Sequence, residues 1–388
     1  MKIFLRALLA TFTVSLLMMS SFMVGYVMRD REDGSNQSFP ILKEAYSILI
    51  QHGLTDPPPA PALEYGMVRG MLQAYNEPHT IFVEPVQHEL DTNALEGRFG
   101  GIGVQLGKDA EGYWVLFPFP EGPARDAGVQ EGDRLLSIEG QAITAETSTE
   151  SLQSSVRGPV GTRVTLEIGR PPDYTPQKIS MERAEIPLPS VTWRLEPVDP
   201  RLGILDVNLI AATTTKELVT GVEDLKGRGA TCFALDLRNN PGGLLTAGVD
   251  IASLFLKEGV IIQEQYRGRD VETYSVEKPG ELANLPLVVL IDHGSASASE
   301  IAAGALQVHQ RALLIGTPSY GKDTIQLVFE LKDGSSLHIT SAHWWIPGLE
   351  PPVGSSGLQP DILVEPASDA AAIDPFIQAA IQACFPQP

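Results

Sequence analysis

From Leu202 onward, short apolar runs alternate with stretches of helical periodicity. Each of three runs of strand length precedes a helix-like segment, and the pairs are 202–207 with 214–226, 232–237 with 244–256, and 287–291 with 297–308. Apolar strands that alternate with helices indicate α/β layers around a largely parallel sheet. Two later runs, 324–331 and 336–341, are joined at Asp333-Gly334 and predict a hairpin.

Two regions of different texture precede this α/β part. Between 96 and 185, short alternating runs are separated by glycine turns, and helix-like segments occupy 123–127 and 148–156. Between 38 and 95 the pattern is helical, with a proline-rich interruption at 56–61. The sequence therefore predicts an α/β core, a compact β-rich module inserted before it, and a small N-terminal helical region.

The N-terminus has the pattern of a signal anchor followed by a linker up to residue 37. Lys2 and Arg6 precede an uncharged run of 22 residues, 7–28, which Arg29 closes. A helix of that length crosses about 30 Å of hydrocarbon, and basic residues before it favour an N-terminus that stays inside. We therefore expect a single-pass protein of the cell membrane with its folded part on the extracytoplasmic side, periplasmic or equivalent.

The net charge of −20 argues against nucleic acid as a partner, because binding to phosphates needs a basic face. The chain has two cysteines, Cys232 and Cys384, and the first lies in an apolar run typical of a buried strand. This favours two inert thiols over a disulfide. No cluster of cysteine, histidine and carboxylate has metal-ligand spacing, so we expect neither a metal nor a cofactor.

The segment 293–300, His-Gly-Ser-Ala-Ser-Ala-Ser-Glu, follows an apolar strand and opens a helix. A serine there lies at the positive end of the helix dipole, next to backbone N–H groups that can stabilise an oxyanion. The same serines are also common helix caps, so the segment alone leaves a purely structural role open. The segment 236–243, Asp-Leu-Arg-Asn-Asn-Pro-Gly-Gly, likewise follows a strand, and its glycines either present N–H groups to a ligand or simply make a tight turn.

Lys322 and Gln326 lie four residues apart in a predicted strand, so both project to one face while Asp323 projects away. A lysine acts as a general base only when burial lowers its pKa, and a neutral glutamine can orient the amine without raising that pKa. The alternative is an ordinary surface lysine. Near the start of the β-rich module, Gly101, Ile102 and Gly103 form a loop of the kind that binds a peptide carboxylate beside a strand edge.

Together these segments resemble the carboxy-terminal processing protease family, the S41 serine peptidases. The resemblance covers nearly all of the chain after the anchor and rests on four stretches: Gly-Ser-Ala-Ser-Ala-Ser-Glu-Ile at 294–301, Asp-Leu-Arg-Asn-Asn-Pro-Gly-Gly at 236–243, Gly-Lys at 321–322, and Gln326. Further matches are Glu-Pro-His-Thr at 77–80, Gly-Ile-Gly at 101–103, the segment from 122 to 133, and Gly-Leu-Gln-Pro-Asp at 357–361.

The resemblance implies an S41 core of crotonase/ClpP-like layers at 186–388, ending in a C-terminal helix, and a PDZ domain at 96–185. It implies Ser297 as nucleophile, Lys322 as base, Gln326 as its support, and the amides of Gly243 and Ala298 as oxyanion donors.

The partners implied are polypeptide substrates, bound by their C-terminal tails to the PDZ domain and cleaved near those tails. Arg157 is a candidate for linking tail binding to the core, and a homo-oligomer or an activating adaptor stays open. One departure from the family pattern is Asp323, where the family usually has glycine. Another is Pro347-Gly348-Leu349-Glu350, where a Gly-Arg pattern is usual.

Three other functions compete with this one. A Ser-His-Asp hydrolase would use His293, which is close to Ser297 and beside Asp292. An incomplete Ser-Lys-Gln set would favour a PDZ scaffold with a silent core, but all three residues are present. An acyl-CoA enzyme with a similar oxyanion hole would explain neither the PDZ-like module nor the expected anchor.

Overall fold

The computed structural model describes residues 39–365 and 374–386, which divide into two compact units at Met67/Val68. The first unit holds helix α2 (Pro40–His52) and the beginning of α3 (Ala60–Tyr75), and no residue of α2 is buried. Both helices follow the periodicity expected from the sequence, and Gly53 caps the C-terminal end of α2 in extended conformation. The N-terminal region is therefore helical, as predicted.

The predicted location at a cell membrane needs correction. Within residues 39–365 and 374–386, no helix combines the length and the apolar content needed to cross a bilayer. The expected anchor, residues 7–28, lies outside the described residues. The single-pass anchor and the extracytoplasmic location derived from it are therefore not carried further.

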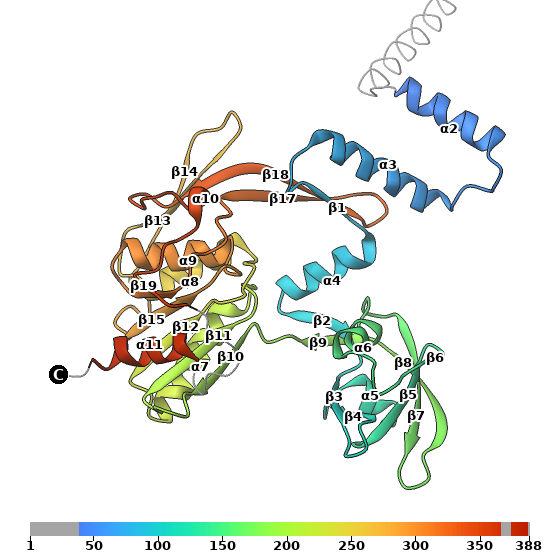
Figure 1. The fold of residues 1–388 in the computed structure, drawn as a ribbon, viewed down its shortest axis with the longest axis horizontal. Coiled ribbons are helices and arrows are strands. Elements are labelled where there is room, and N and C mark those ends of the chain that lie inside the picture. Colours follow the sequence, from blue (N-terminus) through green and yellow to red (C-terminus); the bar gives the residue numbers. More distant parts are fainter. Residues whose placement is uncertain (1–38, 366–373, 387–388) are drawn as a thin grey trace, which may run out of the picture. The chain divides into compact units, whose positions relative to one another are not determined.

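A six-stranded sheet forms the core of the second unit (Figure 1), with the order β10-β11-β12-β15-β16-β19. Its strands are β10 (Val191–Leu195), β11 (Leu202–Val207), β12 (Cys232–Asp236), β15 (Leu287–Ile291), β16 (Leu313–Gly316) and β19 (Ile362–Leu363). Every neighbouring pair is parallel except β10 with β11. The prediction of a largely parallel sheet is confirmed, and β10, β16 and β19 are additions that the sequence analysis did not predict.

Helices cover both faces of this sheet. Helices α7 (Thr214–Gly227), α8 (Leu245–Phe255) and α9 (Ala298–Val308) pack on one face, and α11 (Pro375–Cys384) packs on the other (Figure 1). Successive residues of a strand point to opposite faces of the sheet. Leu205 packs with α7, α8 and α9 on one face, whereas Ile204 packs with α11 on the other. The helices α7, α8 and α9 begin within one residue of their predicted positions, because their apolar stripes match the face that they bury.

A second sheet adjoins the core and contains the predicted hairpin. Its order is β1-β18-β13-β14, with β17 pairing β18. The strands are β1 (Ile81–Val83), β13 (Val260–Tyr266), β14 (Glu272–Ser275), β17 (Thr324–Glu330) and β18 (Ser336–Trp345), and a short helix, α10 (Val353–Ser356), follows. Strand β1 pairs with β18 across more than 250 residues of sequence, so the N-terminal side of this unit contributes directly to the sheet that carries Gln326.

The β-rich module has its own sheet and core. The sheet order is β3-β4-β5-β7-β8, with β6 beside β5. The strands are β3 (Val104–Lys108), β4 (Trp114–Pro118), β5 (Asp133–Ile138), β6 (Gln141–Ala142), β7 (Arg163–Arg170) and β8 (Thr175–Glu182), and the helices are α5 (Pro123–Asp126) and α6 (Thr149–Val156). Strands β2 (Arg98–Gly101) and β9 (Ala184–Pro187) pair at its base, after helix α4 (Pro85–Leu95). The predicted boundaries at 96 and 185 stay predictions.

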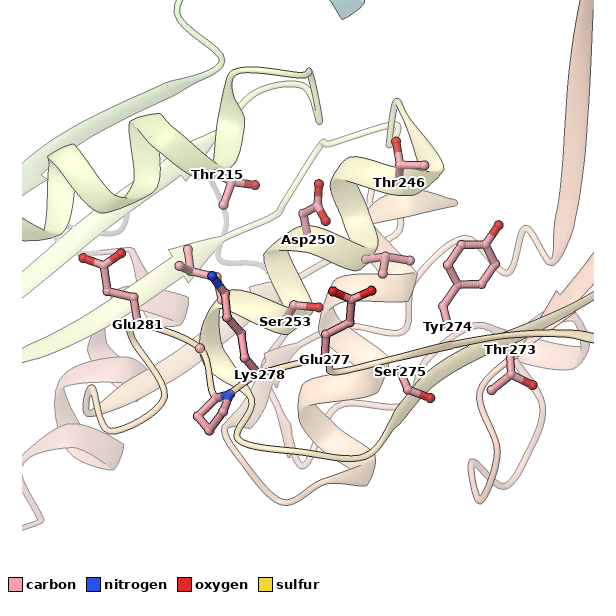
Figure 2. Close-up of a pocket in the computed structure, with 14 residues that line it drawn as sticks. Thr215, Thr246, Asp250, Ser253, Thr273, Tyr274, Ser275, Glu277, Lys278 and Glu281 are labelled. Carbon is pink, nitrogen blue, oxygen red and sulfur yellow. The ribbon is translucent and has the colours of Figure 1, made fainter.

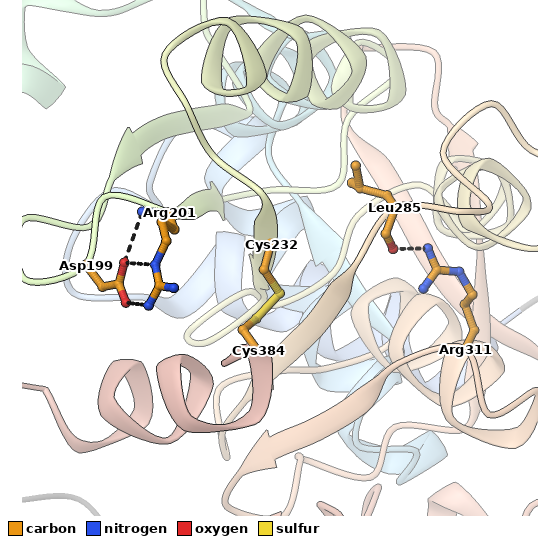
Figure 3. Close-up of a disulfide and its surroundings, with 6 residues drawn as sticks. All are labelled: Asp199, Arg201, Cys232, Leu285, Arg311 and Cys384. Carbon is orange, nitrogen blue, oxygen red and sulfur yellow. Dashed lines mark hydrogen bonds and ion pairs between the residues drawn. A yellow bond between two sulfur atoms is a disulfide. The ribbon is translucent and has the colours of Figure 1, made fainter. Parts of the chain in front are cut away.

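The prediction of two free thiols is wrong, because Cys232 and Cys384 form a disulfide (Figure 3). Cys232 begins buried strand β12, as expected, but helix α11 returns across this face of the sheet and ends with Cys384 beside it. The two Cα atoms are 6.0 Å apart, a normal separation for a disulfide. A contact between residues 152 positions apart cannot be inferred from local patterning.

Candidate functional site

The segment after β15 turns sharply into α9 at Ser297. This residue caps the helix with φ 56° and ψ −117°, a region that residues with side chains rarely adopt. Ser295, which is fully buried, holds the turn by donating a hydrogen bond from Oγ to the Leu237 carbonyl at 2.7 Å. The half-buried Ser297 is thereby placed at the positive end of the α9 dipole.

Asn240 ties the loop between β12 and α8 to the same turn. Its buried amide donates to the Val207 carbonyl at 2.6 Å and accepts from the Gly242 amide at 2.9 Å. The Ser299 hydroxyl donates to Asn240 Oδ1 at 2.8 Å, and the Ala296 amide donates to the Asn240 carbonyl at 3.0 Å. One buried side chain therefore fixes both strand-to-helix loops relative to each other.

The two glycines of this loop are required by its close approach to neighbouring main chain, at Ser297 for Gly242 and at Ile210 for Gly243. A Cβ on Gly242, where φ is 98°, would lie 3.0 Å from the Ser297 Cβ. A Cβ on Gly243, where φ is 148°, would lie 2.0 Å from the Ile210 carbonyl oxygen. In the described part of the chain, the amides of Gly243 and Ala298 donate to no acceptor. Both are therefore available to an oxyanion.

Lys322 and Gln326 lie side by side, but not as two residues of one regular strand. Lys322 precedes β17, which begins at Thr324, and the pairing of β17 with β18 shifts register between Ile325 and Gln326. Lys322 Nζ lies 2.9 Å from Gln326 Oε1, and Gln326 Nε2 donates to the His79 carbonyl. Burial lowers the pKa of the Lys322 amine, although the charges of Glu77 and Glu300 act to raise it. No carboxylate among the described residues forms an ion pair with this amine. A neutral amine here would keep a lone pair for a proton after it has donated to Gln326.

Glu300 joins the serine turn to the lysine strand. Its Oε2 accepts from the amides of Ser297, at 2.7 Å, and Lys322, at 3.0 Å. Its Oε1 accepts from the Gly321 amide and from the Ser319 hydroxyl, each at 2.6 Å. Burial raises the pKa of Glu300, while these four hydrogen bonds act to lower it. The amides of Ser297 and Lys322 thus donate to the same carboxylate oxygen, which holds the two backbones close together.

The side chains of Ser297 and Lys322 make no hydrogen bond to each other within the described residues. The structure therefore places the two main chains side by side but does not display the final proton-transfer contact. Asp323, the departure from the family pattern, faces away from the amine. It lies 3.7 Å from His343 and packs against Gly354.

His293 is not arranged as a base for Ser297. Its exposed ring lies against Tyr320, with 5.8 Å between ring centroids. The neighbouring Asp292 accepts hydrogen bonds from the amides of Asn239, at 2.8 Å, and Gly294, at 2.9 Å. Because Asp292 is bound to the backbone, it does not orient the His293 ring.

The β-rich module has a groove between β3 and α6 with a volume of about 430 Å³. Ile102 and Gly103 line it, and so does Arg157, which follows the last residue of α6 and stacks over Phe99, 4.6 Å from the ring centre. Apart from Arg157 the lining is apolar or uncharged, and it includes Val104, Leu106, Phe119, Thr149, Gln153 and Val156. A groove beside a strand edge, with one positive charge, suits an extended peptide with a terminal carboxylate.

Comparison with known proteins assigns the family. The sequence model of peptidase family S41 matches residues 201–364, and that of the PDZ domain matches residues 120–170. A carboxyl-terminal-processing protease of Synechocystis sp. is 37% identical over 306 residues, which cover 78% of this chain and 71% of that protein. The chain belongs to peptidase family S41. It is a serine-type carboxyl-terminal processing peptidase with a PDZ domain on a mixed α/β fold.

Two further carboxy-terminal processing proteases agree with this assignment. A carboxy-terminal-processing protease of Bartonella bacilliformis is 34% identical, covering 77% of this chain and 68% of that protein. The carboxy-terminal processing protease CtpA of Bacillus subtilis is 31% identical, covering 79% and 66%. The solved photosystem II D1 C-terminal processing protease is 27% identical with a TM-score of 0.46, covering 89% of this chain and 92% of that chain.

Sequence reasoning about this S41 peptidase missed the two side chains that connect its site, Asn240 and Glu300. Glu300 carried a usable signal, because Ser297-Ala-Ser-Glu300 has the spacing of a capping box. Asn240 carried none, because its partners come from β11 and α9.

A cavity of about 720 Å³ lies elsewhere, between α8 and the loop after β14 (Figure 2). Thr246, Asp250, Tyr274 and Lys278 are among its lining residues, and it includes none of the predicted site residues. Its lining is mostly exposed and hydroxyl- or carboxyl-bearing, with no reactive group aimed at a common point. Backbone strain, burial and amides without an acceptor coincide instead at the Ser297 turn of the described structure.

Proposed function

We propose that this S41 peptidase is an endopeptidase that cleaves polypeptides near their C-termini, with Ser297 as nucleophile and Lys322 as general base. The observation that carries the proposal is the Lys322 amine, which burial drives toward its neutral form beside an uncharged Gln326. Glu300 anchors the backbone of this lysine next to that of Ser297.

The reaction would be acyl transfer in two stages. Lys322 takes the proton of the Ser297 hydroxyl as Oγ bonds to the scissile carbonyl carbon, and the amides of Gly243 and Ala298 bind the resulting oxyanion. Lys322 then donates this proton to the leaving amine as the peptide bond breaks. Water next attacks the ester carbonyl, with Lys322 taking its proton. Lys322 returns this proton to Ser297 Oγ as the ester C–O bond breaks and the acid product leaves. Gln326 supports the amine throughout.

Labelling with a fluorophosphonate tests the nucleophile. The full-length protein should react covalently and digest a peptide library, whereas Ser297→Ala should do neither. His293→Ala should keep both properties, because the His293 ring is exposed and packs on Tyr320. Labelling and turnover that persist in Ser297→Ala would overturn the assignment, and an unreactive wild-type protein would favour a PDZ scaffold.

Substrate tails are expected to bind the groove between β3 and α6. We predict that peptides with an apolar last residue and a free carboxylate bind by fluorescence polarisation, and that amidation weakens binding about tenfold or more, since charge-assisted hydrogen bonds are lost. Arg157→Gln should weaken binding of the free-acid peptide several-fold and leave the amidated peptide unaffected. The exposed Arg163 supplies the control, Arg163→Gln. Equal affinities for acid and amide would contradict tail recognition.

A further inference from the structure

The turn Glu77-Pro78-His79-Thr80 lies outside the S41 match at 201–364, yet it reaches the Lys322 centre. The His79 carbonyl accepts a hydrogen bond from Gln326 Nε2, and Gln326 Oε1 faces Lys322 Nζ at 2.9 Å. An amide has one accepting and one donating end. A carbonyl that engages the nitrogen therefore determines that the oxygen faces the amine.

Two side chains of the same turn hold the His79 carbonyl in place. Glu77 accepts from the His79 amide at 3.2 Å and from the Thr80 hydroxyl. Thr80, which is 7% exposed, also accepts from the Thr340 amide at 3.2 Å. Thr340 is the cross-strand partner of Gln326. The turn therefore contacts both members of this strand pair. Its His79 carbonyl accepts from the Gln326 side chain, and its Thr80 hydroxyl accepts from the Thr340 main chain.

The following residues secure the turn to the sheet. Strand β1 pairs antiparallel with β18, from Ile81 opposite His338 to Val83 opposite Ser336. The turn is therefore fixed by a ladder on one side and by Thr80 on the other. Its geometry is coupled to β17 and β18, the hairpin that begins just after Lys322.

We propose that the turn 77–80 is a positioning element of the catalytic centre, in which Glu77 and Thr80 fix the His79 carbonyl so that Gln326 presents its oxygen to Lys322. This inference rests on the proposed function. The residues of the turn act through Gln326 and do not touch the reacting atoms.

The negative charge of Glu77 allows a second test of the proposal, because it affects the pKa of Lys322. Burial acts to raise the pKa of Glu77, but hydrogen bonds from Thr80 and the turn amides outweigh it and hold the pKa below its ordinary value, so the group is a carboxylate. The negative charges of Glu77 and Glu300 both act to raise the pKa of Lys322. His338 is another titratable group that interacts electrostatically with Lys322. The three groups come from the turn, α9 and β18.

Thr80→Val tests the coupling, because it removes the hydroxyl with little change in shape. We expect kcat for a short peptide to fall about tenfold with KM unchanged, and Thr80→Ser to restore it. In a Gln326→Ala background, where no amide remains to be oriented, Thr80→Val should change kcat less than twofold. A tenfold loss in both backgrounds would show a merely structural role and overturn the inference.

Glu77→Gln keeps the accepting oxygen of this side chain and removes its charge. The acid limb of the kcat/KM profile should move to lower pH, because the protonated amine loses a favourable charge, whereas Thr80→Val should leave the limb in place. If Thr80→Val unfolds, as judged by its melting temperature, the Glu77→Gln shift decides alone, and an unmoved limb overturns the inference. Failure of the proposed function looks different, since the wild-type protein would then neither hydrolyse peptides nor react with the fluorophosphonate.

Discussion

Replacement of Lys322 by methionine is expected to lower kcat for peptide hydrolysis roughly 10³- to 10⁴-fold, the range for loss of a positioned general base. Methionine keeps most of the apolar stem, which is half-buried, and loses only the amine. Folding should survive, because the described part of the chain gives this amine no ion pair and its only hydrogen bond is to Gln326. The measurement is kcat under saturating peptide, with melting temperature as the check on folding.

Arginine at the same position discriminates between a base and a positive charge. Lys322→Arg keeps the charge but cannot give up a proton, so it should be as inactive as the methionine variant. The matched control is Lys332→Met, an exposed lysine in the turn of the same hairpin, which should retain wild-type turnover. Substantial activity in Lys322→Arg would mean that lysine acts electrostatically and that another group takes the proton.

The pH dependence of the wild-type enzyme follows from the same amine. Only the neutral form accepts a proton, so kcat/KM should rise with pH through the pKa of Lys322 and then level off. Burial lowers this pKa against the opposing charges of Glu77 and Glu300, so the midpoint of the rise should lie below the ordinary lysine value of about 10.4. The limb should vanish from any residual activity of Lys322→Met.

Local pattern was sufficient for the parts of this site that lie on regular elements. The apolar runs at 202–207 and 287–291 match β11 and β15, because buried parallel strands are apolar along their whole length. Strand alternation does not explain the contact between Lys322 and Gln326, because Lys322 lies before β17 and the pairing of this strand shifts between Ile325 and Gln326.

What the sequence could not supply are contacts between distant segments. The turn at 77–80 contacts Gln326 across 247 positions, and its own pattern indicates only a break before a strand. Glu300 is a plausible cap from its spacing, but its bonds to Gly321 and Lys322 depend on how β17 is placed. These groups are polar and buried, so the fold must satisfy them. Which partner satisfies each one is decided by topology.

Loss of the Cys232–Cys384 disulfide is expected to lower the free energy of unfolding by about 2–5 kcal/mol. The bond joins residues 152 positions apart. The conformational entropy that a crosslink removes from the unfolded chain increases with the length of the loop that it closes. It also fastens α11, the described helix that covers its face of the sheet, over which Phe376, Ile377 and Ala380 are buried. The expected result for Cys232→Ala/Cys384→Ala is therefore a clearly lower urea midpoint than that of the wild-type protein.

Reductant provides the matched comparison within one protein. Tris(carboxyethyl)phosphine should lower the wild-type midpoint toward that of the double variant and leave the variant itself unchanged.

Weakened attachment of α11 should also affect the loop that leads to Gly243. Asp374, which caps α11, lies 2.8 Å from Arg238, and Arg238 pairs with Asp236 at 2.5 Å, directly before the residues that lead to Gly243. Hydrogen exchange should thus quicken first in α11 and next in residues 237–243. A midpoint insensitive to reductant would contradict a stabilising role, and faster exchange confined to α11 would show that the Arg238 contacts hold the loop without the disulfide.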